Sequence, residues 1–207
     1  TICHDELPMH LALKYNGWTS RHVIDAYVKY AKALFENFGD RCRYWLTFNE
    51  INAVRGFGPT GVRKASGQDR YQAAHNMFVA SAKAVTLGHQ LMPKSQFGAM
   101  YAMSELYPAT CKPEDMFHHL QARRENWYFV DTMGRGYYPN YAEELWQRHG
   151  VEKLEMAPED VDTLKRGQLD YIAFSYYRSN TTKSGDDWFN VGGSANPYLE
   201  NTPWGWP

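Results

Sequence analysis

The sequence predicts an α/β fold: part of a parallel (β/α)8 barrel of the TIM type. Short apolar runs alternate with longer segments whose apolar residues recur at helical spacing, the pattern of parallel βαβ units. The chain has 207 residues and 43% hydrophobic content, enough to bury a substantial core. A complete barrel of eight strands takes about 250 residues before insertions. We therefore expect residues 1–207 to form a single fragment with about strands three to six of eight.

The predicted strands are short apolar segments, each followed by a turn or by polar residues. They cover residues 1–3 (the end of a strand), 44–48, 96–100 and 169–174. Long helical segments separate them, so neighbouring strands are expected to run parallel.

Capping residues and helix breakers delimit the predicted helices. Thr19 can cap a helix that runs to Phe38 and ends at Gly39. A glycine-rich loop precedes a second helix over residues 70–92, which Pro93 follows. A helix-rich insertion spans residues 113–150, and Pro158 starts a short helix before the last strand.

Composition excludes several partners and places the chain in the cytoplasm. The formal net charge is -1, which gives no electrostatic case for nucleic acid or an anionic membrane surface. No apolar run has the length of a membrane span. The three cysteines are odd in number and scattered, as expected of reduced thiols in a cytoplasmic protein.

The most informative segment is the predicted strand at 44–48, which runs directly into Asn49 and Glu50. Glutamate is seldom buried without a partner or a function. At the carboxyl end of a barrel strand, where catalytic side chains project, a glutamic acid desolvated by its neighbours can hold a proton near neutrality. Glu50 is therefore predicted to be a general acid.

Several segments resemble motifs of glycoside hydrolase family 1, the β-glucosidase and 6-phospho-β-glucosidase family. They occur in the family's order, at Thr47–Glu50 (TFNE), His4–Pro8, Gly17–Trp18, Asp170–Tyr177 and Asn196–Pro207. The amino-acid sequences of Asn49–Asn52 and Phe174–Tyr177 resemble the 6-phospho-β-glucosidase branch more than the plain β-glucosidases. The resemblance covers essentially the whole chain.

The resemblance implies a retaining β-glycosidase that needs no cofactor and acts on a small sugar or sugar phosphate. Glu50 matches the acid/base residue, and Asn49 matches the asparagine that hydrogen-bonds the sugar 2-hydroxyl. His4 matches a histidine that binds a sugar hydroxyl, and Tyr177 matches the tyrosine that hydrogen-bonds the nucleophile. Ser175 stands where many relatives have asparagine.

The resemblance also implies that part of the machinery is missing. The family's nucleophilic glutamate follows the seventh strand, and no segment of this chain resembles it, so the fragment alone is expected to be inactive. Asp5 stands where the family has an aromatic residue, which puts the apolar wall of the sugar pocket in doubt. The phosphate-binding loop lies outside the chain as well.

One other interpretation stays open. The chain can be a non-catalytic, sugar-binding or truncated remnant of the same fold. A metal hydrolase would need ligand spacing that His118–His119 and residues 4–10 do not have, so no metal site is predicted.

An open half-barrel exposes strand edges and apolar surface. We therefore expect copies of the chain to self-associate.

Overall fold

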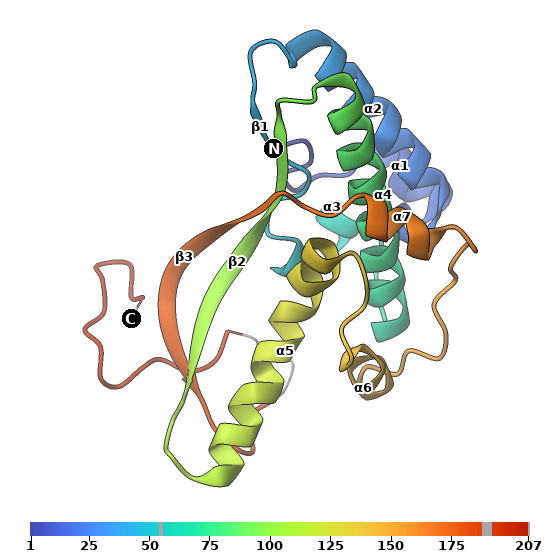
Figure 1. The fold of residues 1–207 in the computed structure, drawn as a ribbon. Helices are drawn as coiled ribbons and strands as arrows, with labels where there is room; N and C mark the ends of the chain where they lie inside the picture. The colour runs from blue at the N-terminus through green and yellow to red at the C-terminus, as the bar shows by residue number, and fades with distance from the viewer. Residues whose placement is uncertain (54–55, 188–191, 207) are drawn as a thin grey trace.

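The computed structural model describes residues 1–53, 56–187 and 192–206, in which parallel strands are covered by helices (Figure 1). Three strands form a sheet in the order β1-β2-β3, with both pairs parallel: β1 (Tyr44–Leu46), β2 (Gln96–Pro108) and β3 (Tyr171–Thr182). Cys3 makes a further parallel bridge to Phe48. The four predicted strand positions are thus confirmed, in the predicted order. Pro207, the last residue of the C-terminal motif, lies outside the described residues.

Helical segments connect the strands. In chain order they are α1 (Met9–Tyr15), η1 (Gly17–Thr19), α2 (His22–Phe38), η2 (Ile51–Ala53), α3 (Phe57–Thr60), α4 (Gly67–Leu91), α5 (Pro113–Arg135), α6 (Ala142–Arg148) and α7 (Asp160–Arg166). The helix-rich insertion is confirmed as α5 and α6, and α5 ends where Gly136 adopts the left-handed conformation.

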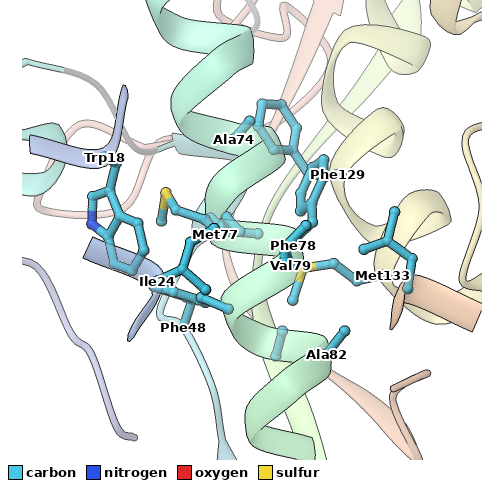
Figure 2. Packing of buried hydrophobic residues seen from close by; sticks show 14 of the residues in the cluster. Trp18, Ile24, Phe48, Ala74, Met77, Phe78, Val79, Ala82, Phe129 and Met133 are labelled. Carbon is cyan, nitrogen blue, oxygen red and sulfur yellow. The ribbon is translucent and has the colours of Figure 1, made fainter. Parts of the chain in front are cut away.

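The core is built around α4. Its residues Met77, Phe78 and Val79 are almost fully buried, and so are the side chains on either side of the helix (Figure 2). Phe48 of the β1 exit and Phe129 of α5 belong to the same cluster. Burying each large apolar side chain stabilises the fold by about 1.5–3 kcal/mol. Because α4 is covered on nearly all sides, it fixes the layer of helices against the sheet.

The start of α2 differs from the prediction. Thr19 was expected to cap the helix, but it ends the short helix η1, and α2 begins at His22. The Thr19 hydroxyl is used locally, because it donates to the Asn16 carbonyl at 2.7 Å and accepts from the Asn16 amide at 3.0 Å. Ser20 Oγ instead accepts from the His22 backbone N–H, at 3.3 Å.

Strands β2 and β3 are longer than predicted, whereas β1 is shorter. β2 was expected to end at residue 100 and β3 at residue 174, yet their pairing continues to Pro108 and Thr182. The register shifts between Met103 and Glu105, which pair with Tyr176 and Ser179. Two residues of β3 therefore oppose one of β2, and this bulge lets the pair curve along α5 (Figure 1).

Three cysteines are free in the structure: Cys3, Cys42 and Cys111. Among the described residues, no helix is long and apolar enough to cross a membrane.

Candidate active site

The chain that leaves β1 is held on both sides by backbone hydrogen bonds. The Met100 N–H donates to the Phe48 carbonyl at 2.9 Å, and the Asn49 N–H donates to the Cys3 carbonyl at 3.0 Å. Asn49 thus lies between the N-terminal segment and β2, at the carboxyl edge of the sheet. Barrel enzymes place their catalytic side chains at this edge.

Glu50 follows in an unusual backbone conformation. Its φ angle is 39°, in the left-handed region that non-glycine residues seldom adopt. The side chain is half-buried, and its carboxylate accepts a hydrogen bond from the hydroxyl of Ser175 on β3. The structure therefore brings Glu50 and Ser175 together from segments 125 residues apart.

Asn52 locks the turn that carries Glu50. Its side chain accepts from the Ala102 N–H at 2.9 Å and donates to the Ala102 carbonyl at 3.0 Å, so it occupies the place of a further strand residue beside β2. Its amide also approaches Asn126 Oδ1 on α5 at 3.3 Å. Asn52 is 2% exposed. It therefore fixes the backbone two residues after the acid.

His4 and Asn49, the two polar residues predicted to bind the sugar beside Glu50, lie close together in the backbone pairing between the N-terminal segment and the β1 exit. His4 follows Cys3, whose carbonyl accepts from the Asn49 N–H. The His4 ring is exposed, and its Nε2 lies 3.7 Å from the Asp5 carboxylate. Burial, with smaller effects of the Asp5 and Glu6 carboxylates, raises the pKa of the Cys3 thiol to about 11. Cys3 is therefore a protonated thiol at neutral pH and no nucleophile.

Tyr177 lies in the bulge of β3, where it and Arg178 oppose Ser104 of β2. Its ring is 61% exposed and contacts the ring of Trp206, with centroids 5.4 Å apart. Bulges beside active sites commonly redirect a side chain. Two residues earlier on the same strand, Ser175 contacts Glu50, so β3 links Tyr177 to the acid.

These groups can perform proton transfer and sugar binding. One carboxyl group with a hydroxyl donor stands at the β1 exit, an amide and an imidazole flank it on the neighbouring backbone ladder, and a phenol lies further along β3. In the part of the chain that the structure describes, no group of three or more His, Cys, Asp or Glu side chains could hold a metal ion. The arrangement suits acid/base chemistry on a polyhydroxylated substrate.

Comparison with known proteins identifies the family of this chain. The sequence profile of glycosyl hydrolase family 1 matches residues 1–200. The chain belongs to glycosyl hydrolase family 1. Aryl-phospho-β-D-glucosidase BglH of Bacillus subtilis is 41% identical over 220 residues, which cover 100% of this chain and 46% of that protein. The 6-phospho-β-glucosidase AscB of Escherichia coli is 38% identical, with the same coverage.

Solved structures of family 1 have the same fold. A β-glucosidase from Exiguobacterium marinum superposes with a TM-score of 0.80 at 25% identity, over 97% of this chain and 47% of that one. The family 1 β-glucosidase from Thermotoga maritima gives a TM-score of 0.78 at 26% identity, over 97% and 45%. The chain thus spans about half the length of its family 1 relatives, and the partial barrel is confirmed.

Sequence reasoning missed two features of this family 1 site. Ser175 was noted only as standing where many relatives have asparagine, because its hydrogen bond to Glu50 depends on tertiary packing between β3 and the β1 exit. Asn52 received no role, although it stands in the quoted segment Asn49–Asn52. Its position two residues after Glu50 could have indicated a role, because asparagine side chains commonly form hydrogen bonds with nearby backbone groups.

Proposed function

We propose that this chain supplies the acid/base half of a retaining β-glycosidase that hydrolyses 6-phospho-β-glucosides. The observation that carries the proposal is the Glu50 carboxyl group at the β1 exit, fixed by Ser175 and by the Asn52 turn, in a chain that belongs to family 1. Glu50 would first protonate the glycosidic oxygen and then deprotonate the attacking water. No cofactor is needed for this chemistry.

The other site residues would bind the sugar and tune the charges around it. The Asn49 amide can both donate to and accept from the 2-hydroxyl, a contact that strengthens in the transition state. His4 would bind another hydroxyl of the same sugar. Tyr177 would donate to the nucleophilic carboxylate, which would come from a segment outside residues 1–207.

The preference for a 6-phosphorylated sugar rests on two supports. The amino-acid sequence around Glu50 and Tyr177 resembles that of the 6-phospho-β-glucosidase branch. The relatives with 41% and 38% identity carry phospho-β-glucosidase names. The loop that would bind the 6-phosphate is expected outside this chain.

We further propose that residues 1–207 alone do not turn over substrate, since double displacement needs two carboxyl groups about 5–5.5 Å apart. The competing proposal is that the chain is a non-catalytic remnant. The exposed side chains of His4 and Tyr177 favour that proposal only if no second half of a barrel completes the site.

We also infer that copies of the chain associate through the open side of the sheet. Its free thiols fit a cytoplasmic location.

Hydrolysis of p-nitrophenyl β-glucoside, with and without a 6-phosphate, tests the proposal. We expect a full-length protein that contains these residues to prefer the phosphorylated substrate, and the 207-residue chain to be inactive on both. A full-length protein with no activity on either substrate would favour the non-catalytic remnant. Turnover by the 207-residue chain would require a second carboxyl group within it and would contradict the assignment of halves.

A further inference from the structure

A cavity of about 490 Å³ opens beside the loop that follows Glu50. Its walls are that loop, the first turn of α4 and the end of α6. α4 connects the end of β1 to the start of β2, so its first turn lies at the carboxyl edge of the sheet. Four of the lining side chains are basic, namely Arg63, Arg70, Arg148 and His149, and none of the described lining residues is acidic.

Two of these basic residues already have a counter-charge. Glu125 is 1% exposed and accepts from Arg148 Nη1 at 3.2 Å, while its other oxygen lies 2.7 Å from His149 Nε2. Arg148 also donates to Glu144 at 2.6 Å. Arg148 and His149 therefore shape the wall of the cavity, and both already contact acidic side chains.

Arg70 is not compensated in this way. Its guanidinium packs over the rings of Tyr71 and Phe129, 5.6 and 5.5 Å from the ring centroids. Its Nε and Nη2 atoms are buried without a hydrogen-bond partner, and within the described residues it forms no ion pair. A partly buried charge that lacks an acceptor costs free energy, which an anion at its open edge would offset.

Arg63 adds a second uncompensated charge to the lining of the cavity. It is exposed, packs over the Phe57 ring at 5.2 Å, and forms no ion pair within the described part of the chain. Two guanidinium groups that line one cavity suit an oxyanion with several oxygens, because the planar fork of N–H donors on each guanidinium can bind two oxygens of a phosphate at once.

The cavity is held open by tight packing between α4 and the segment after α6. A Cβ atom on Gly67 would lie 1.9 Å from the His149 carbonyl oxygen, so only glycine allows this approach. The Gln68 side chain donates to the Lys153 carbonyl at 2.7 Å and accepts from the Glu152 N–H at 3.0 Å. A pre-formed wall of this kind lowers the cost of ordering a ligand.

We propose that this cavity binds a doubly charged oxyanion of the phosphate type, with Arg70 and Arg63 as its charged ligands. The site is separate from the acid/base centre, because Glu50, Asn49 and Tyr177 do not line it. It is also built wholly within residues 56–149, so it does not depend on the other half of a barrel. Either a free phosphate ion or the phosphate of an organic ester could supply the ligand.

Thermal unfolding of the 207-residue protein tests the proposal. Sodium phosphate, sodium sulfate and phenyl phosphate are titrated at constant ionic strength set with sodium chloride, so that general screening is matched. We expect a saturable rise of Tm with phosphate. Arg70→Gln and Arg63→Gln should each weaken the apparent affinity by at least about tenfold, the loss of a charge-assisted hydrogen bond. Arg166→Gln, at an exposed position of α7, is the matched control.

The outcomes separate clearly. A stronger effect of phenyl phosphate than of inorganic phosphate would identify an ester as the ligand, and the reverse order would identify the free ion. The proposal would be overturned if neither inorganic phosphate nor phenyl phosphate raised Tm in a saturable way beyond the effect of chloride. The same holds if Arg63→Gln, which removes no buried contact, responds like Arg166→Gln. Activity toward glycosides is not measured, so the fate of the proposed function does not affect the result.

Discussion

Glu50 combines a strained backbone with a specific side-chain contact. A non-glycine residue in the left-handed region costs about 1–2 kcal/mol, and Glu50 adopts a φ of 39° there. Such strain persists where surrounding contacts enforce it, and it clusters at functional sites. The contacts here are those of Ser175 with the carboxylate and of Asn52 with Ala102.

Substitution of Asn52 tests whether this turn is held as described. Asn52→Ala leaves the N–H and the carbonyl of Ala102 without their partner, and should destabilise the protein by about 2 kcal/mol. Urea denaturation measures the loss. Asn37→Ala removes an exposed amide that donates only within α2 and should cost far less. Equal losses in both variants would remove the special role of Asn52.

The site residues differ in how far sequence could predict them. Glu50 was predicted because a buried apolar strand leads directly into it, and the role of Asn49 came from the family resemblance. The contact of Glu50 with Ser175 joins residues 125 positions apart in the sequence. A local sequence pattern cannot predict a contact between residues so far apart. The half-burial of Glu50 likewise depends on tertiary packing rather than on its neighbours in sequence.

Among the elements, strand order and helix positions were predictable, but several ends were not. The start of α4 could have been placed correctly, because Ser66 and Asp69 form a capping box that its sequence spacing announces. The extensions of β2 and β3 could not, since each depends on pairing with the other across more than 70 residues. Thr19 failed as a cap because the Asn16 turn uses its hydroxyl.

One buried carboxylate joins α4 and α7 to Arg21, the residue before α2. Asp160 accepts from Arg21 at 2.6 and 2.8 Å, and His75 Nε2 lies 2.9 Å away. Burial alone would raise the pKa of Asp160, but hydrogen bonds from Arg21, the Ala157 N–H and His75 outweigh it and lower the pKa to about 2. Burial lowers the pKa of His75 below its usual value.

Both shifts predict acid sensitivity. An aspartate with a lowered pKa contributes stability above its unfolded pKa of about 4, which is lost as the pH falls toward 2. His75 acts in the same direction, because below about pH 6.5 the unfolded state binds a proton that the folded state resists.

Asp160→Asn should therefore lower the free energy of unfolding at pH 7 by about 2–3 kcal/mol, toward the low end for a broken buried pair because Arg21 is one-third exposed. The difference from the unsubstituted protein should shrink as the pH approaches 2. Asp162→Asn, exposed on the same helix, is the control. A difference that stays constant between pH 7 and pH 2 would show that the Asp160 charge does not act as described.

At the scale of the whole molecule, the sheet is open. Ile172, Phe174 and Tyr176 alternate along β3 and are 46%, 62% and 50% exposed, so they form an apolar stripe on one face of the strand. An uncovered stripe of this kind beside an edge strand favours association. The relatives that this chain matches are about twice its length.

Self-association should therefore depend on this stripe. Phe174→Lys is expected to shift the protein toward monomers, measured as the molar mass by light scattering over a wide concentration range. Phe117→Lys alters an equally exposed phenylalanine on α5 and should leave the molar mass unchanged. A protein that is monomeric at every concentration before any substitution would refute self-association.

The acid/base assignment of Glu50 is tested most directly by Glu50→Gln in a full-length protein that contains these residues. Rates are compared for an alkyl 6-phospho-β-glucoside, whose leaving group needs a proton, and for an activated aryl one, which needs little. Glu50→Gln should abolish turnover of the alkyl substrate yet spare much of the first step for the aryl substrate. Equal loss on both substrates would contradict the role of Glu50 as the proton donor.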